Sequence, residues 1–287
     1  MKKYTKLLTL AAAILTISAF SGCAKKSDSA NGKQRTIRIA TKGTAKPYIT
    51  RDEAGNLGGY DTAVIKAVFE RLPQYKPEFI INSDPLTGLL SGQFDVSYNN
   101  WSYNDKRSQS YFYSYPYDKI VYDFIQRKGD TPLTSFEDIA NRGYVFESGA
   151  GFNVANAFEK WNEENPDKQI KIVYTESDIL VQYQHIQDGV YDFRVDDHPM
   201  TKLYSETYDL SGLQFTQIND EVAASISKSL HSFFLFPKDE GGLKLRNEVN
   251  VVLKQLREDG TLDKLAIEYF GSTDQVPDLE NYETPIN

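Results

Sequence analysis

Cysteine and histidine are scarce in this sequence of 287 residues. The one cysteine is Cys23, which excludes a disulfide within the chain and a metal site built on several cysteines. The three histidines, His185, His198 and His231, have no common spacing, so we expect neither a shared zinc site nor a cofactor. Basic residues are also in the minority, because 32 Lys and Arg face 40 Asp and Glu. The formal charge of −8 disfavours binding to nucleic acid.

Long apolar runs are missing after residue 23, so we expect no membrane-spanning channel. The first residues differ, because three lysines precede an apolar run at 7–20 that is short for a transmembrane helix. This layout is typical of a secretory signal, and we expect residues 1–22 to be removed. Their removal takes away three lysines and no acids, which changes the formal charge from −8 to −11.

The leader ends at Ser21-Gly22-Cys23, which resembles a bacterial lipobox, with Phe20 where leucine is usual. This resemblance implies a lipid-modified Cys23 that carries palmitate at the mature N-terminus, and an unmodified cysteine is the alternative. Residues 23–35 are small and polar, a composition typical of a flexible tether. We therefore expect a lipid-anchored body on the outer face of the cytoplasmic membrane, attached through the anchor only.

The body alternates strand and helix patterns, which predicts an α/β protein with a mostly parallel sheet. Asp61 suits the N-cap of a helix whose apolar stripe runs from 64 to 72. The alternation restarts after Gly129, which predicts a second α/β lobe. We expect strands at 36–40, 79–81, 94–98, 143–146, 170–174 and 191–195. We expect further helices at 153–161 and 177–188, and two more that end near residues 260 and 270.

Ordered motifs then extend over essentially the whole mature chain. They are GTAKPY (43–48), GNLGGYDTAVIKAV (55–68), LLSGQFDVSYNNWSYNDKR (89–107), FYSYPY (112–117), SFEDIANRGYVFESGAG (135–151), DGVYDFRVDD (188–197) and LREDGTLDKLAIEYFG (256–271). In this order they resemble the amino-acid-binding solute receptors of ABC importers, which have the bilobed periplasmic-binding-protein fold.

This resemblance implies two α/β lobes joined by a two-strand hinge that close over a ligand. We expect lobe 1 at 36–125 and 230–271, lobe 2 at 128–226, and a loose surface tail at 272–287. The hinge candidates are residues 123–127 and 225–231. The implied protein is a monomeric binding protein, not an enzyme, that delivers an amino acid to a permease and ATPase complex.

A free amino acid is a zwitterion, so both of its charges need partners after losing water. Arg107 resembles the family arginine that forks onto the α-carboxylate, and Asp197 resembles the acid that receives the ammonium. Asp196 remains exchangeable with Asp197 from the sequence. The other pocket residues that the resemblance implies are Asn99, Asn100 and Ser102, and the backbone of Gly149, Ala150 and Gly151 before a helix. A solvated arginine and an ordinary glycine turn are the competing interpretations.

The first pocket motif also departs from many relatives. Lys42 stands where they carry an acid, and Ala45 stands where they carry an aromatic wall, while Tyr48 ends the motif. The pocket is therefore expected to be wide and less acidic. Lys42 with Lys46 favours a ligand with a second carboxylate, and the alternative is that they are solvated surface lysines. Within the family the chain looks most like receptors for cystine, with another polar amino acid as the alternative. A ligand sensor, an adhesin, and a dehydratase-like enzyme on the same fold also stay open.

Overall fold

The computed structural model describes residues 34–283 and 286. The expected signal, Cys23 and nearly all of the tether lie outside the described residues. Within the described part of the chain no helix is long and apolar enough to cross a membrane.

The first sheet, which with its helices we call lobe 1, has the strand order β4-β1-β5-β13-β6, with β7 also paired to β13. Strand β1 runs parallel to β4 and to β5, while β13 runs antiparallel to β5. Its strands are β1 (Arg35–Thr41), β4 (Tyr75–Ile81), β5 (Val96–Ser102), β6 (Tyr111–Tyr113), β7 (Asp118–Lys119) and β13 (His231–Pro237). A small hairpin, β2 (Thr50–Arg51) and β3 (Leu57–Gly58), lies between β1 and the first helix.

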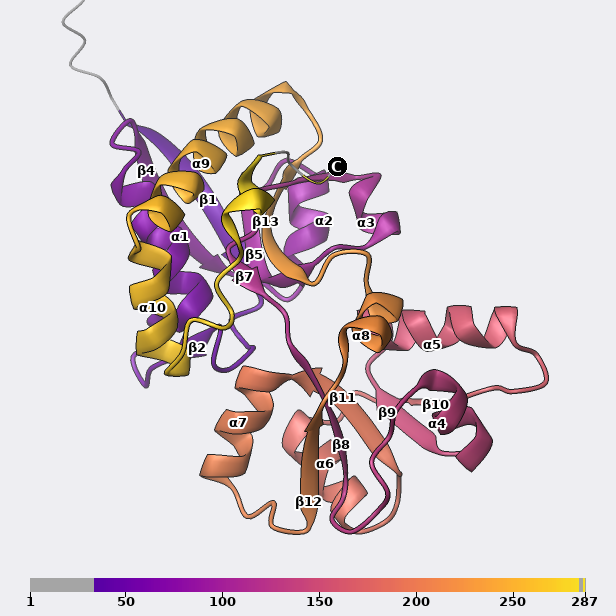
Figure 1. Ribbon diagram of the computed structural model, residues 1–287. Coiled ribbons are helices and arrows are strands. Elements are labelled where there is room, and N and C mark those ends of the chain that lie inside the picture. Colours follow the sequence, from indigo (N-terminus) through magenta and orange to yellow (C-terminus); the bar gives the residue numbers. More distant parts are fainter. Residues whose placement is uncertain (1–33, 284–285, 287) are drawn as a thin grey trace, which may run out of the picture. The chain divides into compact units, whose positions relative to one another are not determined.

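Five helices belong to lobe 1, and α1, α9 and α10 pack against one another beside the sheet (Figure 1). They share one apolar core with β1 and β13, as the predicted helical stripes require. The helices are α1 (Tyr60–Glu70), α2 (Pro85–Leu90), α3 (Asp105–Ser108), α9 (Glu240–Glu258) and α10 (Thr261–Phe270).

The second sheet, the basis of lobe 2, has the order β10-β9-β11-β8-β12. Strands β10, β9 and β11 are parallel, whereas β8 is antiparallel to both of its neighbours. The strands are β8 (Tyr122–Arg127), β9 (Val145–Ser148), β10 (Lys171–Tyr174), β11 (Phe193–Asp197) and β12 (Leu213–Gln217). The helices are α4 (Phe136–Arg142), α5 (Asn153–Glu164), α6 (Ile179–Gln187), α7 (His198–Thr207) and α8 (Asp220–Ile226).

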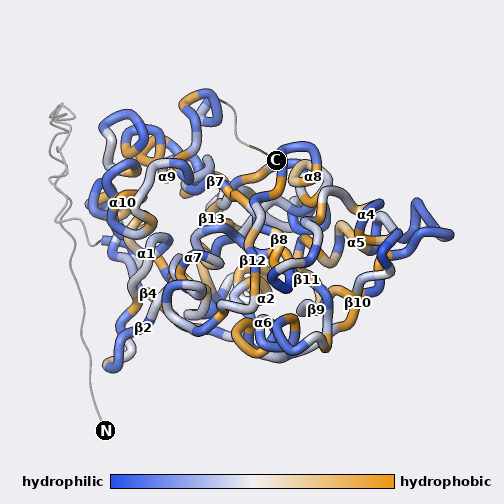
Figure 2. Tube along the Cα trace, turned by 60° about the horizontal axis from the view of Figure 1, so that its bottom comes forward, coloured by the Kyte–Doolittle hydropathy of each residue, from blue (hydrophilic) through white to orange (hydrophobic). Residues whose placement is uncertain are grey.

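Each lobe has an apolar core of its own. The core of lobe 2 is aromatic, with Phe136, Phe146, Phe158 and Phe193 in edge or tilted contact. Figure 2 shows the pattern along the chain, with hydrophobic stretches in β8 and β13 and a strongly hydrophilic loop between α5 and β10. The two alternating strand and helix series expected from the sequence are therefore two separately packed units.

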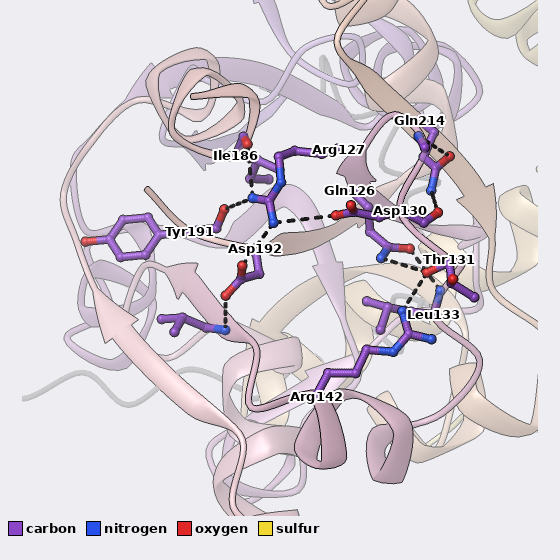
Figure 3. A network of polar contacts seen from close by, with 12 residues as sticks. Gln126, Arg127, Asp130, Thr131, Leu133, Arg142, Ile186, Tyr191, Asp192 and Gln214 are labelled. Atoms are coloured by element: carbon purple, nitrogen blue, oxygen red, sulfur yellow. Dashed lines mark hydrogen bonds and ion pairs between the residues drawn. The ribbon is translucent and has the colours of Figure 1, made fainter. Parts of the chain in front are cut away.

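The chain passes from lobe 1 to lobe 2 earlier than expected. Strand β8 pairs along its length with β11 and β12, so residues 123–127 lie inside the second sheet, and the crossing falls at residues 120–121. Figure 3 shows that Arg127 is held within lobe 2: its guanidinium donates to the carbonyl oxygen of Tyr191 at 2.9 Å and pairs with Asp192 and Asp130. The return crossing is at residues 227–230, within the expected 225–231.

The tail after α10 also differs from the expectation of a loose surface segment. Val276 and Tyr282 are buried in the core of lobe 1, and the Tyr282 ring meets Tyr115 with centroids 5.6 Å apart. The 3-10 helix η1 (Leu279–Tyr282) carries this tyrosine, and the Nε of Arg257 donates to the carbonyl oxygen of Pro277. Val276 and Tyr282 are single buried residues in a segment without a hydrophobic period, so the sequence pattern did not predict their burial.

Candidate functional site

The predicted site residues gather where β1 and β5 of lobe 1 end and where β11 and the start of α5 in lobe 2 meet them. Four hydrogen bonds join the lobes directly here. Asn100 donates to Asp197, Asn153 donates to Ser102 and to the carbonyl oxygen of Tyr103, and Ser227 donates to that same carbonyl. Two surface hollows lie elsewhere on lobe 1, along α9 and beside η1, and this site is defined by its converging side chains.

Asn100 is the centre of these contacts. It has a left-handed φ of 50°, an uncommon conformation for a residue other than glycine. Its backbone N–H donates to Asp61 Oδ2 at 2.6 Å, and its side-chain Nδ2 donates to Asp197 Oδ2 at 2.7 Å. Its Oδ1 accepts from the Ser232 hydroxyl. One asparagine thus links α1, β13 and the opposite lobe.

Asp61 is not the helix cap that the sequence predicted. Helix α1 has Gly59 at its N-cap without a side-chain bond, and Asp61 is fully buried in the first turn. A side chain at Gly59 would lie 2.5 Å from the carbonyl oxygen of Tyr48, which explains the glycine. Asp61 instead accepts the N–H of Asn100, and burial raises its pKa from 3.8 to about 7.

Asp196 and Asp197 have separate partners. Asp196 accepts two hydrogen bonds from the buried Arg194 guanidinium, at 2.9 and 2.8 Å. Asp197, the last residue of β11, has no lysine, arginine or histidine partner in the described part of the chain. Burial, and next the charge of Asp196, raise the pKa of Asp197 to about 7. Of these two neighbouring acids, Asp197 is therefore the one whose carboxylate lacks a cationic partner among the described residues.

Arg107 is half-buried on the short helix α3. Its Nη1 donates to the carbonyl oxygen of Ser102 at 2.6 Å, and its guanidinium carbon lies 5.1 Å from the centroid of the Trp101 ring. No carboxylate of the described residues forms an ion pair with it. The guanidinium is thus held in place while its charge stays unpaired.

Trp101 also contacts Lys42, whose Nζ lies 6.0 Å from the ring centroid. The indole Nε1 donates to Ser97 Oγ, which fixes the ring. Lys42 is exposed and has no ion-pair partner among residues 34–283. Two unpaired cations therefore flank one fixed aromatic ring.

The remaining predicted residues have different environments. Asn99 accepts from the Thr41 hydroxyl and the Lys42 N–H, so it joins β5 to the end of β1. Ala45 is half-buried, and Tyr48 is a fully buried core residue whose hydroxyl lies beside Asp197. Ala150 and Gly151 form an exposed turn before α5, in which Gly151 has a φ of 79°.

Sequence reasoning missed Asn153 and Phe152. Asn153, the first residue of α5, donates to Ser102 Oγ at 2.6 Å and to the carbonyl oxygen of Tyr103 at 2.9 Å. Phe152 next to it is 64% exposed at the end of the turn. The sequence carried a signal for both residues, because they directly follow the glycine-rich turn.

Comparison with known proteins gives a consistent result. Residues 37–272 match the family described as bacterial extracellular solute-binding proteins, family 3. The probable amino-acid-binding protein YxeM of Bacillus subtilis (strain 168) is 28% identical, over 94% of this chain and 96% of its own. The L-cystine-binding protein TcyK of the same organism is 23% identical, over 94% of this chain and 97% of its own.

A solved structure has the same arrangement. It is reported as "Molecular and structural basis of glutathione import in Gram-positive bacteria via GshT and the cystine ABC importer TcyBC of Streptococcus mutans". It matches with a TM-score of 0.76 and 27% identity, and covers 87% of this chain and all of its own. The expected resemblance and the bilobed α/β fold are both confirmed.

Proposed function

Since the chain belongs to the bacterial extracellular solute-binding proteins of family 3, we propose that it captures a free amino acid between its lobes for an ABC importer. The observation that carries this proposal is a pair of uncompensated opposite charges. Arg107 lacks a carboxylate and Asp197 lacks a cation among the described residues, and Trp101 and Asn100 hold them in place. A zwitterion supplies both missing partners.

In this proposal the Arg107 guanidinium binds the α-carboxylate, and the N–H groups at 149–151, before α5, add donors at a positive helix end. Asp197 binds the ammonium. The pairing of Asp196 with Arg194 supports Asp197 as the acid, because Asp196 already has its counter-ion. Asn99, Asn100 and Ser102 complete the polar lining on lobe 1, while Ala45 leaves room beside Tyr48.

Cystine is the ligand that we favour. Lys42 beside Trp101 offers a second cation, and cystine carries a second carboxylate. A curated relative is named an L-cystine-binding protein, and the solved structure above is reported with a cystine importer. The same report names glutathione, which also carries two carboxylates, so glutathione is the second candidate.

A thermal-shift screen of the mature protein tests both the function and the ligand. A ligand that binds only the folded state at 100 times its Kd stabilises it by about 2.7 kcal/mol, so a true ligand raises the melting temperature clearly. We expect L-cystine to give the largest shift among the twenty amino acids, cystine and glutathione. If none of them raises the melting temperature, the proposed amino-acid binding is wrong. If glutathione gives a larger shift than cystine, glutathione is the ligand.

We further propose that the protein is a monomeric lipoprotein on the outer face of the membrane and that its partners are a permease and an ATPase. The family's extracellular location and the lipobox-like residues before Cys23 support this. Adjacent genes for a permease and an ATPase would favour transport over a sensor or adhesin role. Incubation with prephenate-like acids should yield no product, whereas a product peak would support a dehydratase.

A further inference from the structure

Three carboxylates meet behind the ammonium position. Asp61 comes from α1 and Asp118 from β7, both in lobe 1, and Asp197 comes from β11 in lobe 2. Asp61 and Asp118 are both 0% exposed. Asn100 donates to both Asp61 and Asp197, and Ser232, which donates to Asn100, has its hydroxyl 3.5 Å from Asp118 Oδ2, so the three acids surround these two polar residues.

The three acids have hydrogen bonds but no positive charge. No lysine, arginine or histidine of the described residues pairs with any of them, whereas the other buried acids near them, Asp123 and Asp196, do have such partners. Asp61 Oδ1 and Asp118 Oδ1 are buried without a hydrogen-bond partner in the described part of the chain. Unpartnered buried carboxylate oxygens need a compensating charge or proton.

The three acids are divided between the lobes, with Asp61 and Asp118 in lobe 1 and Asp197 in lobe 2, so the distance between them depends on lobe closure. If the lobes separate, Asp197 moves away from Asp61 and Asp118 and regains water. If they close, the half-buried Asp197 comes beside two fully buried acids, where ionisation of all three carboxylates is unfavourable. Closure with an ionised, unpaired Asp197 is therefore unfavourable.

We propose that Asp61 and Asp118 are specificity-determining residues, which place acidic groups behind Asp197 so that the lobes close only when a ligand ammonium or a proton neutralises it. This inference rests on the proposed amino-acid function. It assigns the site a charge requirement: a deaminated analogue satisfies Arg107 but leaves Asp197 unpaired and does not close the lobes. Neither acid contacts the α-carboxylate side of the site.

Other titratable groups also face Asp197. They come from the loop before β2, from α1, from β7 and β8, from β11 itself and from α7, and none of them brings an unpaired cation. These groups are Tyr48, Asp61, Asp118, Tyr122, Asp196 with its partner Arg194, and His198, which pairs with Asp123.

The direction of the pH effect follows from this arrangement. Burial on closure raises the pKa of Asp197 to about 7, while a solvated aspartate titrates near 4. Between about pH 4 and pH 7, Asp197 is therefore protonated in the closed state and ionised in the open state. Acidification from pH 7 to pH 5 should raise the closed-to-open ratio of the ligand-free protein by up to about tenfold per pH unit.

Small-angle scattering of the mature, ligand-stripped protein tests this without knowledge of the ligand. The radius of gyration should be larger at pH 8 than at pH 5.5. Asp118→Asn and Asp197→Asn should each make the protein more compact at pH 8. Asp167→Asn, an exposed acid of lobe 2 with no ion pair, is the matched control and should behave as the parent.

Equal radii of the parent at both pH values would overturn the inference, and this comparison needs no variant to fold. Compaction of Asp167→Asn equal to that of Asp118→Asn would also overturn it, because net charge alone would then be the cause. Failure of the proposed function is a separate result. It would appear as the absence of any amino-acid shift in the ligand screen, whatever the scattering shows.

Discussion

Asn100 Nδ2 and Asp197 Oδ2 are 2.7 Å apart although they belong to different lobes. This hydrogen bond fixes the orientation of a site carboxylate that has no cation among the described residues. A ligand ammonium at the other oxygen of Asp197 would complete its coordination.

Removing either half of the charge pair should abolish most binding. Arg107→Ala and Asp197→Asn each leave a ligand charge buried without its partner, which costs about 2 to 5 kcal/mol, or roughly 30-fold to several thousandfold in Kd. Titration calorimetry with the ligand found in the screen measures this. Near-parent affinity in both variants would show that Arg107 and Asp197 do not bind the charges of the ligand.

Asp196→Asn is the matched control on the neighbouring position. It removes the counter-ion of buried Arg194, and breaking a buried pair costs about 3 to 5 kcal/mol of folding stability. We therefore expect Asp196→Asn to lower the melting temperature, and Asp197→Asn to lower affinity without lowering it. The reverse pattern would show that Asp196 holds the ammonium.

Lys42→Ala should weaken ligands that have two carboxylates. An exposed cation contributes about 1 kcal/mol or less, so the Kd for cystine should rise up to about fivefold. An amino acid with one carboxylate should bind as before. Lys46→Ala is the control, because Lys46 is exposed nearby without a contact to Trp101. An equal loss of affinity for ligands with one and with two carboxylates would show that Lys42 does not bind a second carboxylate.

Folding stability should decrease as the pH rises from about 4 to 7. Burial raises the pKa of Asp61 from 3.8 to about 7 in the folded protein, so the folded state binds more protons than the unfolded state in this window. Deprotonation then favours unfolding. Denaturant unfolding of the parent at pH 5 and pH 7.5 should show this loss.

Asp61→Asn should reduce that pH dependence, and its amide oxygen can still accept the Asn100 N–H. Asp167→Asn removes the same charge from the surface and should keep the parent's dependence. If Asp61→Asn and the parent lose the same stability between the two pH values, Asp61 is not the titrating group.

Cys23→Ala should prevent lipid anchoring. With the anchor removed, we expect release into the medium or an unprocessed precursor, measured by fractionation and gel mobility. A variant that fractionates and migrates as the parent does would disprove the anchor.

The sequence was sufficient for the elements whose signal is periodic. The stripes of α1, α9 and α10 and the alternation of strands predicted two α/β lobes, because burial of a whole face imposes a repeat. Asp118, Asn153 and the inward role of Asp61 depend on contacts between segments far apart in the chain. A single polar residue has no period, so its partner across the hinge cannot be read from local pattern. Tyr282 is likewise a single residue outside any periodic pattern, so its burial was not predicted.

The buried tail places both ends of the described chain in the same lobe. Residue 34 leads into β1, and Tyr282 packs against Tyr115, so residues 120–230 form one continuous excursion into lobe 2 and back. Any attachment at either terminus, whether an anchor, a tag or a solid support, transmits force to lobe 1 alone. Lobe 2 is held by the two crossing segments and by the hydrogen bonds at the site, so a pull on either end of the described chain reaches it only through lobe 1.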